Sequence, residues 1–348
     1  MSQEVKPSGD LEFEAPILEL EKKIEELEVF AETTQMDLSG QIRDLLQKLD
    51  EEKRRVYAGL SPWQRVQIAR HPNRPLTSDY LNMIVEDFME LYGDRLFSDD
   101  RAIVCGFGKI SGMKMLIVGH RKGKGTKEKV ECNFGSAHPE GYRKALDKMR
   151  IAAKFGLPIF CIIDTPGAYP GVGAEERGQA QAIARNLMEM TRFRTPIVCL
   201  VIGEGGSGGA LGIGVGDRTL MLENAYYSVI SPEGCAAILW KTGDKAPEAA
   251  DVLRLTARDL DEFGVVDDII AEPLGGAHRD HVKTAEAVRE AVVRHFTELS
   301  AMSLDHLVSE RYLKHRAVGQ YLEHSKEVKT RSKARVAKRA PAKKARAS

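Results

Sequence analysis

A run of glycines at residues 203–209 constrains this chain more than any other feature of its sequence. It reads Gly-Glu-Gly-Gly-Ser-Gly-Gly and follows an apolar run at 197–202, so a buried strand is expected to end in a loop almost without side chains. Glycine backbone reaches conformations that other residues avoid, and a ligand can approach it closely. N–H groups that converge at such a loop and at the helix start after it bind negative charge. The loop therefore predicts an anion-holding element.

The same letters satisfy the patterns of three different chemistries. Glycines at 203, 205 and 208 form a dinucleotide-binding fingerprint, with Glu223 at the distance of a ribose-binding acid. Gly205-x-Ser207-x-Gly209 is also the nucleophile elbow of an α/β-hydrolase. The acids and histidines that follow it in triad order are Asp267, Asp268, His278, His281 and His295. The third possibility is an oxyanion hole, in which backbone amides stabilise charge and no side chain attacks the substrate.

A second apolar run, at 159–163, ends in another loop of prolines and glycines at 164–173. Its Asp-Thr-Pro-Gly start is typical of a GTPase switch segment, but the chain has no Gly-x-x-x-x-Gly-Lys-Ser/Thr phosphate loop, which excludes that class. Two such loops can instead face one cleft and hold the reacting end of an elongated substrate with main-chain donors. The dinucleotide interpretation leaves this second loop unexplained, and the glycine-rich stretch 208–216 is a poor helix to support a hydrolase elbow.

Bulk composition bounds the class of protein. The chain has 348 residues, of which 43% are hydrophobic and 29% charged, which is enough to build a large core. No apolar run reaches the roughly 20 residues of a membrane helix, and the N-terminus lacks the pattern of a signal peptide, so a cytoplasmic protein is expected. The 5 cysteines form no Cys-x-x-Cys pair, and His278 with His281 lacks a third ligand at a defined spacing. No metal site is predicted.

The net charge of zero conceals a basic C-terminus. From Lys326 to Ser348, 10 Lys or Arg stand against 1 Glu, so this segment carries +9 and the rest of the chain −9. Its Ala, Lys, Arg, Ser and Pro composition predicts disorder. The charge fits either a solubilising tail or one that binds nucleic acid or another acidic partner.

Periodicity divides the rest of the chain into two parts. Apolar residues spaced by three and four predict two amphipathic helices, interrupted at 33–40, and each is too short for a solitary coiled coil, so we expect a hairpin. Prolines at 62, 72 and 75 then mark a break.

The body after this break alternates short apolar runs with helical stretches. Expected strands are 102–107, 113–119, 158–163, 197–202, 219–222 and 227–230, and expected helices are 140–155, 175–191, 235–240, 247–253, 257–263 and 277–300. This order predicts α/β layering of repeated β-β-α units. The predicted domains are 1–75 (helical hairpin and linker), 76–324 (α/β body) and 325–348 (tail).

Several longer blocks together carry a family resemblance. The segment 196–217 is similar to the oxyanion-hole segment of the crotonase superfamily. With the blocks 133–135, 139–146, 164–179, 227–235 and 273–279, the chain resembles the α subunits of bacterial acetyl-CoA carboxylase carboxyltransferase. The resemblance extends from the N-terminal helices to about Tyr321, and the basic tail departs from it. It implies a crotonase-like spiral of β-β-α units preceded by a helical hairpin.

The resemblance also implies a reaction and partners. Such a subunit works with a β subunit, as α2β2, to move the carboxyl group from carboxybiotin on a biotin carboxyl carrier protein to acetyl-CoA, giving malonyl-CoA for fatty-acid synthesis. The chain holds no metal, and ATP is used by a separate biotin carboxylase. By motif position, Gly205 and Gly206 are the biotin-side oxyanion contacts. The other implied carboxybiotin contacts are Gly167, Ala168, Tyr169, Ser207, Gly208 and Gly209.

Two other classes stay open beside this one, namely an α/β-hydrolase-like serine enzyme and a noncatalytic scaffold subunit. The basic segment 121–129 is expected to face water, with CoA phosphates or the partner subunit as alternatives. A side-chain base is not needed in either glycine loop, because backbone donors can stabilise a thioester enolate and activated biotin can accept the methyl proton.

Overall fold

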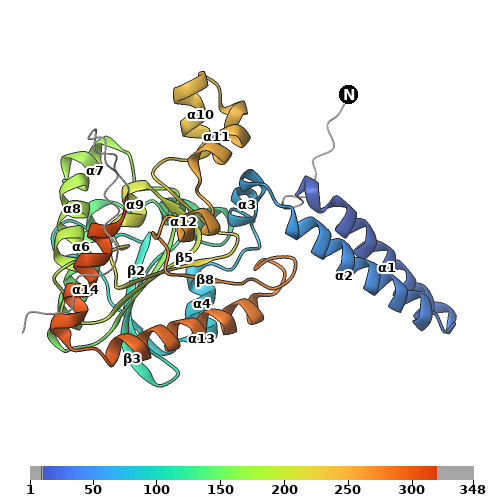
Figure 1. Cartoon of the computed structure of the whole chain (residues 1–348), viewed down its shortest axis with the longest axis horizontal. Helices are drawn as coiled ribbons and strands as arrows, with labels where there is room; N and C mark the ends of the chain where they lie inside the picture. Colours follow the sequence, from blue (N-terminus) through green and yellow to red (C-terminus); the bar gives the residue numbers. More distant parts are fainter. Residues whose placement is uncertain (1–8, 10, 320–348) are drawn as a thin grey trace, which may run out of the picture. The chain divides into compact units, whose positions relative to one another are not determined.

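The computed structural model describes residue 9 and residues 11–319, and within them one sheet of eight strands organises the chain (Figure 1). The strands are β1 (Glu86–Glu90), β2 (Ile103–Ile110), β3 (Met113–His120), β4 (Ile159–Thr165), β5 (Ile197–Gly206), β6 (Arg218–Leu222), β7 (Tyr226–Ser228) and β8 (Asp268–Ile270). Their order is β1-β2-β3-β4-β5-β6-β8, and β7 pairs with the end of β5. The first three strands are antiparallel, and all pairs from β3 onward are parallel.

The helices are α1 (Ala15–Thr34), α2 (Ser39–Ala58), α3 (Pro62–Ala69), α4 (Thr77–Ile84), α5 (Gly125–Glu131), α6 (Pro139–Lys154), α7 (Val172–Glu176), α8 (Gln179–Met190), α9 (Ser207–Leu211), α10 (Pro232–Trp240), α11 (Ala246–Leu253), α12 (Ala257–Glu262), α13 (His281–Ser300) and α14 (Leu304–Ala317). Helices α1 and α2 pack on each other, and α10 packs on α11. Helix α6 packs against β2 and β3, and α13 packs against β5 and β8. None of the described helices is long and apolar enough to cross a membrane.

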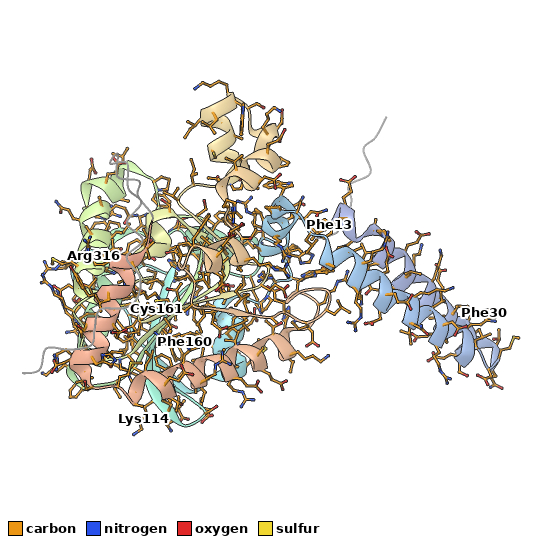
Figure 2. All side chains as sticks on the ribbon, viewed as in Figure 1. Phe13, Phe30, Lys114, Phe160, Cys161 and Arg316 are labelled. Carbon is orange, nitrogen blue, oxygen red and sulfur yellow. The ribbon has the colours of Figure 1, made fainter. Side chains whose placement is uncertain are left out.

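The central strands β4 and β5 are buried along their whole length. Parallel strands covered on both faces are expected to read as continuous apolar runs, as these do. Phe160 and Cys161 lie in this interior, whereas Phe30, near the turn between α1 and α2, is about half exposed (Figure 2). The α/β class and the N-terminal hairpin are therefore confirmed. The predicted basic tail, 325–348, lies outside the described residues.

Several element boundaries differ from prediction for local reasons. The expected helix 175–191 is two helices, because Gly178 between α7 and α8 has φ +83°, a left-handed conformation that ends the first helix. The expected helix 277–300 begins only at His281, where the Asp280 side chain caps the Lys283 N–H at 2.9 Å. The break predicted from prolines contains α3, since Pro62 occupies the first helical turn after the capping residue Ser61.

Candidate functional site

The two glycine loops lie against each other at the carboxyl ends of β4 and β5. A Cβ on Gly206 would lie 2.1 Å from the carbonyl oxygen of Pro166, and a Cβ on Gly209 would lie 2.4 Å from the nitrogen of Ala168. Real Cβ atoms do not approach backbone this closely, so glycine is required at both positions. The structure therefore brings the two predicted loops into direct backbone contact.

The predicted residues of the first loop occupy different environments. Gly205 lies inside the sheet, paired with Thr165 and Tyr227, and its nearest side chain is the Tyr227 ring. Gly206 ends β5 and precedes α9, whose first turn carries Ser207, Gly208 and Gly209. Gly209 is buried, whereas Ser207 and Gly208 are partly exposed. No side chain caps this helix, so its first N–H groups are available as donors.

The second loop presents backbone rather than functional side chains to the first. The Gly167 N–H donates to the Thr165 hydroxyl at 3.1 Å, and Ala168 is partly exposed beside Gly209. Tyr169 is held away from this contact. Its ring stacks on His138 with centroids 4.1 Å apart, and its carbonyl oxygen accepts a hydrogen bond from the Gln179 side chain.

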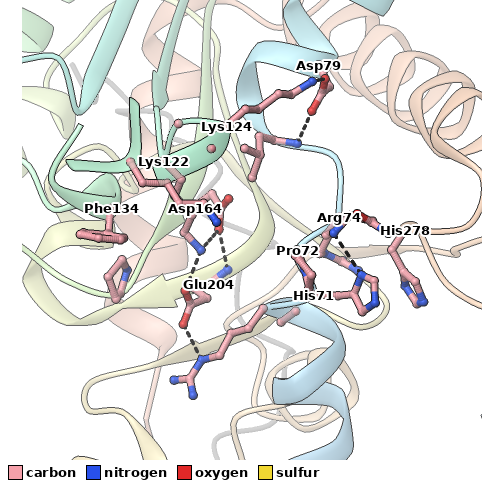
Figure 3. Close-up of a pocket in the computed structure, with 18 of the residues that line it drawn as sticks. His71, Pro72, Arg74, Asp79, Lys122, Lys124, Phe134, Asp164, Glu204 and His278 are labelled. Carbon is pink, nitrogen blue, oxygen red and sulfur yellow. Dashed lines mark hydrogen bonds and ion pairs between the residues drawn. The ribbon is translucent and has the colours of Figure 1, made fainter. Parts of the chain in front are cut away.

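A cluster of charges that sequence reasoning missed lies directly behind both loops (Figure 3). Lys122 Nζ lies 2.8 Å from Asp164 Oδ1 and 2.6 Å from Glu204 Oε2. Glu204 Oε1 also receives the Arg70 guanidinium at 2.7 Å and the Tyr226 hydroxyl at 2.6 Å. In the sequence, Asp164 directly follows the apolar run 159–163 and Glu204 comes two residues after the run 197–202, which is the signal that could have found the cluster.

Within the cluster, Glu204 and Lys122 stabilise each other's charged form. Burial raises the pKa of the Glu204 carboxyl, but Lys122 and Arg70 outweigh it and lower that pKa to about 2. Burial lowers the pKa of Lys122, whereas Asp164 and Glu204 raise it, and the net shift is upward. Both shifts favour the charged forms of Glu204 and Lys122.

A cavity of about 660 Å³ opens beside this cluster (Figure 3). Its walls include Lys122, Asp164, Pro166 and Glu204, together with the segment 69–74. Arg74 belongs to this wall, and its guanidinium pairs with the Glu272 carboxylate at 2.5 Å and donates to the Ile202 carbonyl oxygen of β5 at 2.7 Å. The cavity thus begins at the strand ends that carry both loops, as is common for ligand sites in parallel sheets.

The geometry gives the hydrolase interpretation no support. His278 contacts Glu14, His281 contacts the Asn73 carbonyl oxygen and His295 contacts Asp268. The other candidate acid, Asp267, pairs with Lys314. Within the described residues, no hydrogen bond joins any of these groups to Ser207, although its backbone φ of +50° is unusual for a residue other than glycine.

The dinucleotide interpretation also meets a structural obstacle. Glu223 does follow β6, the neighbour of β5, as that interpretation requires. Its carboxylate, however, accepts the Glu272 N–H at 3.4 Å and faces Arg258 at 3.8 Å. The loop at 166–168 packs where a Cβ of Gly206 or Gly209 would lie, and the dinucleotide interpretation assigns that loop no role.

Three residues far apart in sequence could hold a divalent cation by residue type. Glu14, His71 and His278 are brought together where α1 and α2 join the body, and sequence spacing could not find this group. The ring nitrogens of His71 already bond the Gly9 carbonyl oxygen and the Asn73 N–H. Arg279 adds a positive charge 3.4 Å from Glu14. These contacts satisfy Glu14 and His71 without an ion.

Comparisons with known proteins agree with the resemblance. Residues 10–319 match the family described as acetyl co-enzyme A carboxylase carboxyltransferase-like. The chain is 55% identical over 313 residues to the acetyl-coenzyme A carboxylase carboxyl transferase subunit alpha of Geobacter metallireducens, covering 90% of this chain and 98% of that protein. It is 54% identical over 312 residues to the protein of the same name from Bacillus cereus, covering 90% and 96%.

Solved structures show the same fold at low identity. Transcarboxylase 12S superposes with a TM-score of 0.51 at 17% identity, covering 73% of this chain and 44% of that one. The β subunit of geranyl-CoA carboxylase from P. aeruginosa gives a TM-score of 0.51 at 15% identity, covering 73% and 45%. This agrees with the crotonase-like architecture that the resemblance implied. The chain belongs to the family of acetyl-coenzyme A carboxylase carboxyltransferase α subunits.

Proposed function

We propose that this chain supplies the α half of a carboxyltransferase site, in which the carboxyl group of carboxybiotin passes to acetyl-CoA and gives malonyl-CoA. Family membership supports the reaction. The observation that carries the placement of the site is the backbone contact of Gly206 and Gly209 with the loop at 166–168. This contact fixes two sets of main-chain groups in one place without relying on any side chain.

The reaction needs stabilisation of negative charge more than it needs a nucleophilic side chain. The N–CO₂ bond of carboxybiotin breaks, a C–C bond forms to the methyl carbon of acetyl-CoA, and the methyl proton passes to biotin. Charge develops on the thioester oxygen and on the ureido oxygen of biotin, and fixed donors lower the barrier. We assign the main-chain N–H groups at Gly206 and in the first turn of α9, which no side chain caps, to the biotin side.

The proposal includes partners that this chain does not contain. A β subunit would hold most of the CoA thioester, in an α2β2 assembly. A biotin carboxyl carrier protein would deliver carboxybiotin, and a separate biotin carboxylase would use ATP to charge it. We place the assembly in the cytoplasm and assign any nucleic-acid binding to the basic segment 325–348 alone.

The test is carboxyl transfer from malonyl-CoA to biocytin by this chain alone, by the chain with its β subunit, and by Gly206→Ala with the β subunit. We expect activity only in the wild-type pair, and a loss of at least about 100-fold in kcat for Gly206→Ala, the size of effect seen when an oxyanion donor is lost. Gly106→Ala is the matched control. Its Cβ would also meet backbone, the Met89 carbonyl oxygen at 2.5 Å, but in the β1–β2 pair.

The outcomes distinguish the carboxyltransferase from a serine enzyme and from a noncatalytic scaffold. Full activity of the Gly206→Ala pair, or an equal loss per folded complex in Gly106→Ala, would contradict the placement of the site. Labelling of Ser207 by a fluorophosphonate would favour the serine enzyme. An inactive wild-type pair that still assembles would favour a noncatalytic scaffold.

A further inference from the structure

We propose that Lys122 is a positioning residue for carboxyl transfer: its largely buried ammonium ties the end of β4 to the end of β5 and so sets the distance between the two glycine loops. This inference rests on the proposed function. It concerns a side chain that the glycine motifs do not include and that lies on a third strand end, two residues after β3.

The contacts of Lys122 are those of a tether. Its side chain is 16% exposed, and Nζ reaches Asp164 at 2.8 Å and Glu204 at 2.6 Å (Figure 3). Asp164 comes two residues before Pro166, which touches Gly206, and Glu204 comes two residues before Gly206 itself. One cation therefore joins the two points from which the loops depart.

The sheet does not fix this distance by its regular pairing. The ladder between β4 and β5 is regular from Ile159 opposite Ile197 as far as Ile163 opposite Val201. The next pair is Thr165 opposite Gly205, so two steps along β4 correspond to four along β5. Such an irregularity bends a strand and interrupts its pairing, which resumes only at Thr165 and Gly205. The Lys122 tether spans the irregular step.

Without the cation, the same step would hold two carboxylates close together. Asp164 Oδ1 accepts the backbone N–H of Glu204 at 3.0 Å, which brings the Asp164 carboxylate next to the residue that carries the second one. Arg70 pairs with Glu204, but within the described residues Asp164 has an ion pair with Lys122 alone. Removal of Lys122 should therefore push the two strand ends apart by like-charge repulsion.

A small shift here has a large effect because the loop contact leaves no free space. Backbone atoms of Gly206 and Pro166 are already so close that a methyl group cannot enter. A displacement of about 1 Å in a positioning element can lower a rate by about 100-fold. The ion pairs of Lys122 thus help to determine where the backbone N–H donors of the two loops lie.

The experiment compares Lys122→Met with Lys314→Met, each assembled with the β subunit and assayed for transfer from malonyl-CoA to biocytin. Lys314 is a matched control, since its side chain is also 16% exposed and it joins Asp267 to the Thr219 hydroxyl in another part of the sheet. We expect Lys122→Met to lower kcat about 100-fold per folded complex with less than about a twofold change in KM for malonyl-CoA. Lys314→Met should keep kcat within about twofold.

A conservative variant and a partner variant keep the inference falsifiable if Lys122→Met does not fold. Lys122→Arg keeps a cation that can reach both carboxylates, and we expect its kcat within about tenfold of wild type. Glu204→Gln removes one arm of the tether and should lower kcat about tenfold at unchanged KM. Full activity of Glu204→Gln, or equal losses of kcat in Lys122→Met and Lys314→Met, would overturn the tether.

These outcomes are distinct from those that test the proposed function. If the wild-type pair is active and Gly206→Ala is not, but Lys122→Met keeps its kcat, the tether is wrong and the function stands. If the wild-type pair has no activity, the proposed function fails and the inference about Lys122 fails with it.

Discussion

Buried charges lie beside both the glycine loops and the base of the N-terminal hairpin, but the apolar cores next to these charges differ greatly in size. Behind the loops, Lys122, Asp164 and Glu204 lie at the ends of strands that belong to one large apolar core. Among the residues that the structure describes, the hairpin has a small core of its own, in which Ile17, Ile24 and Leu49 are buried and further apolar side chains are partly buried. The positions of the loops are therefore fixed by strands of the large core, whereas the position of the hairpin depends on the few contacts at its base.

The base of the hairpin is a polar junction. Glu14, just before α1, receives hydrogen bonds from Tyr57 and from Arg279, and it lies 3.4 Å from His278. Glu21 pairs with Arg279 at 2.8 Å. Burial raises the pKa of Glu14, but its hydrogen bonds and the nearby charges lower it to about 2, as for Glu204. The junction also contains His71, whose pKa of about 4 lies closer to neutral pH than that of either glutamate.

Breaking the buried pair behind the loops should have the largest effect on stability. Arg74→Met removes the partner of Glu272, and the two side chains are only 3% and 1% exposed. The uncompensated carboxylate and the lost bond to the Ile202 carbonyl should cost about 3–5 kcal/mol of unfolding free energy. Urea unfolding followed by far-UV circular dichroism measures this.

The double variant Arg74→Met with Glu272→Met is the control for that explanation. Replacing both partners removes the stranded charge, so we expect it to recover at least half of the loss. A double variant as unstable as Arg74→Met alone would mean that packing, and not charge, explains the cost.

A cavity in the hairpin should have a smaller and more local effect. Leu49→Ala removes one of the three buried apolar side chains of that core and should cost about 2–3 kcal/mol. Because so little else holds α1 and α2 together, hydrogen exchange should accelerate there and stay unchanged in β4 and β5. Val201→Ala in β5, a change of similar type in the large core, should instead lower the global midpoint. Equal acceleration throughout the chain in Leu49→Ala would contradict this division.

The same contrast explains how much of the fold the sequence could predict. Strands β4 and β5 were found because both are uninterrupted apolar runs, and α1 and α2 because their apolar residues follow helical spacing. Helix α14 was missed because one of its two buried residues is Arg311, which pairs with Asp217. The short strands β1 and β8 were missed because their neighbours in the sheet, and not their own composition, make them strands.

The candidate site also has a part that the sequence could predict and a part that it could not. The glycine loops were visible because closely approaching backbone needs glycine at positions such as Gly206 and Gly209. The assignment of those loops to carboxybiotin stays a prediction. Lys122 could not be identified, since it was one cation within a basic segment, 121–129, expected to face water. Only the topology, which places the ends of β3, β4 and β5 side by side, shows that this lysine differs from its neighbours.

The smallest predicted effect is a pH dependence confined to the hairpin. Burial and the nearby His278 lower the pKa of His71 to about 4, so protonation favours the unfolded state, and hairpin stability should fall as the pH drops from about 6.5 towards 4. Glu14, with its pKa lowered to about 2, contributes stability that is complete above about 4.5 and is lost only below that pH. The two groups thus act in different pH windows.

His71→Gln separates those windows. Glutamine can still donate to the Gly9 carbonyl oxygen, which His71 contacts at 2.8 Å, but it does not titrate. Between pH 6.5 and 4.5 the wild-type hairpin should lose about 1 kcal/mol of protection, a value reduced for the partial exposure of His71, and the variant should lose none. Hydrogen exchange in α1 and α2, corrected for intrinsic rates, gives this slope, and His281→Gln should keep it because His281 bonds the Asn73 carbonyl oxygen, which lies outside the hairpin. If the pH slope of hairpin stability is unchanged in His71→Gln, that slope does not come from His71. The two regions then differ only in the size of their apolar cores.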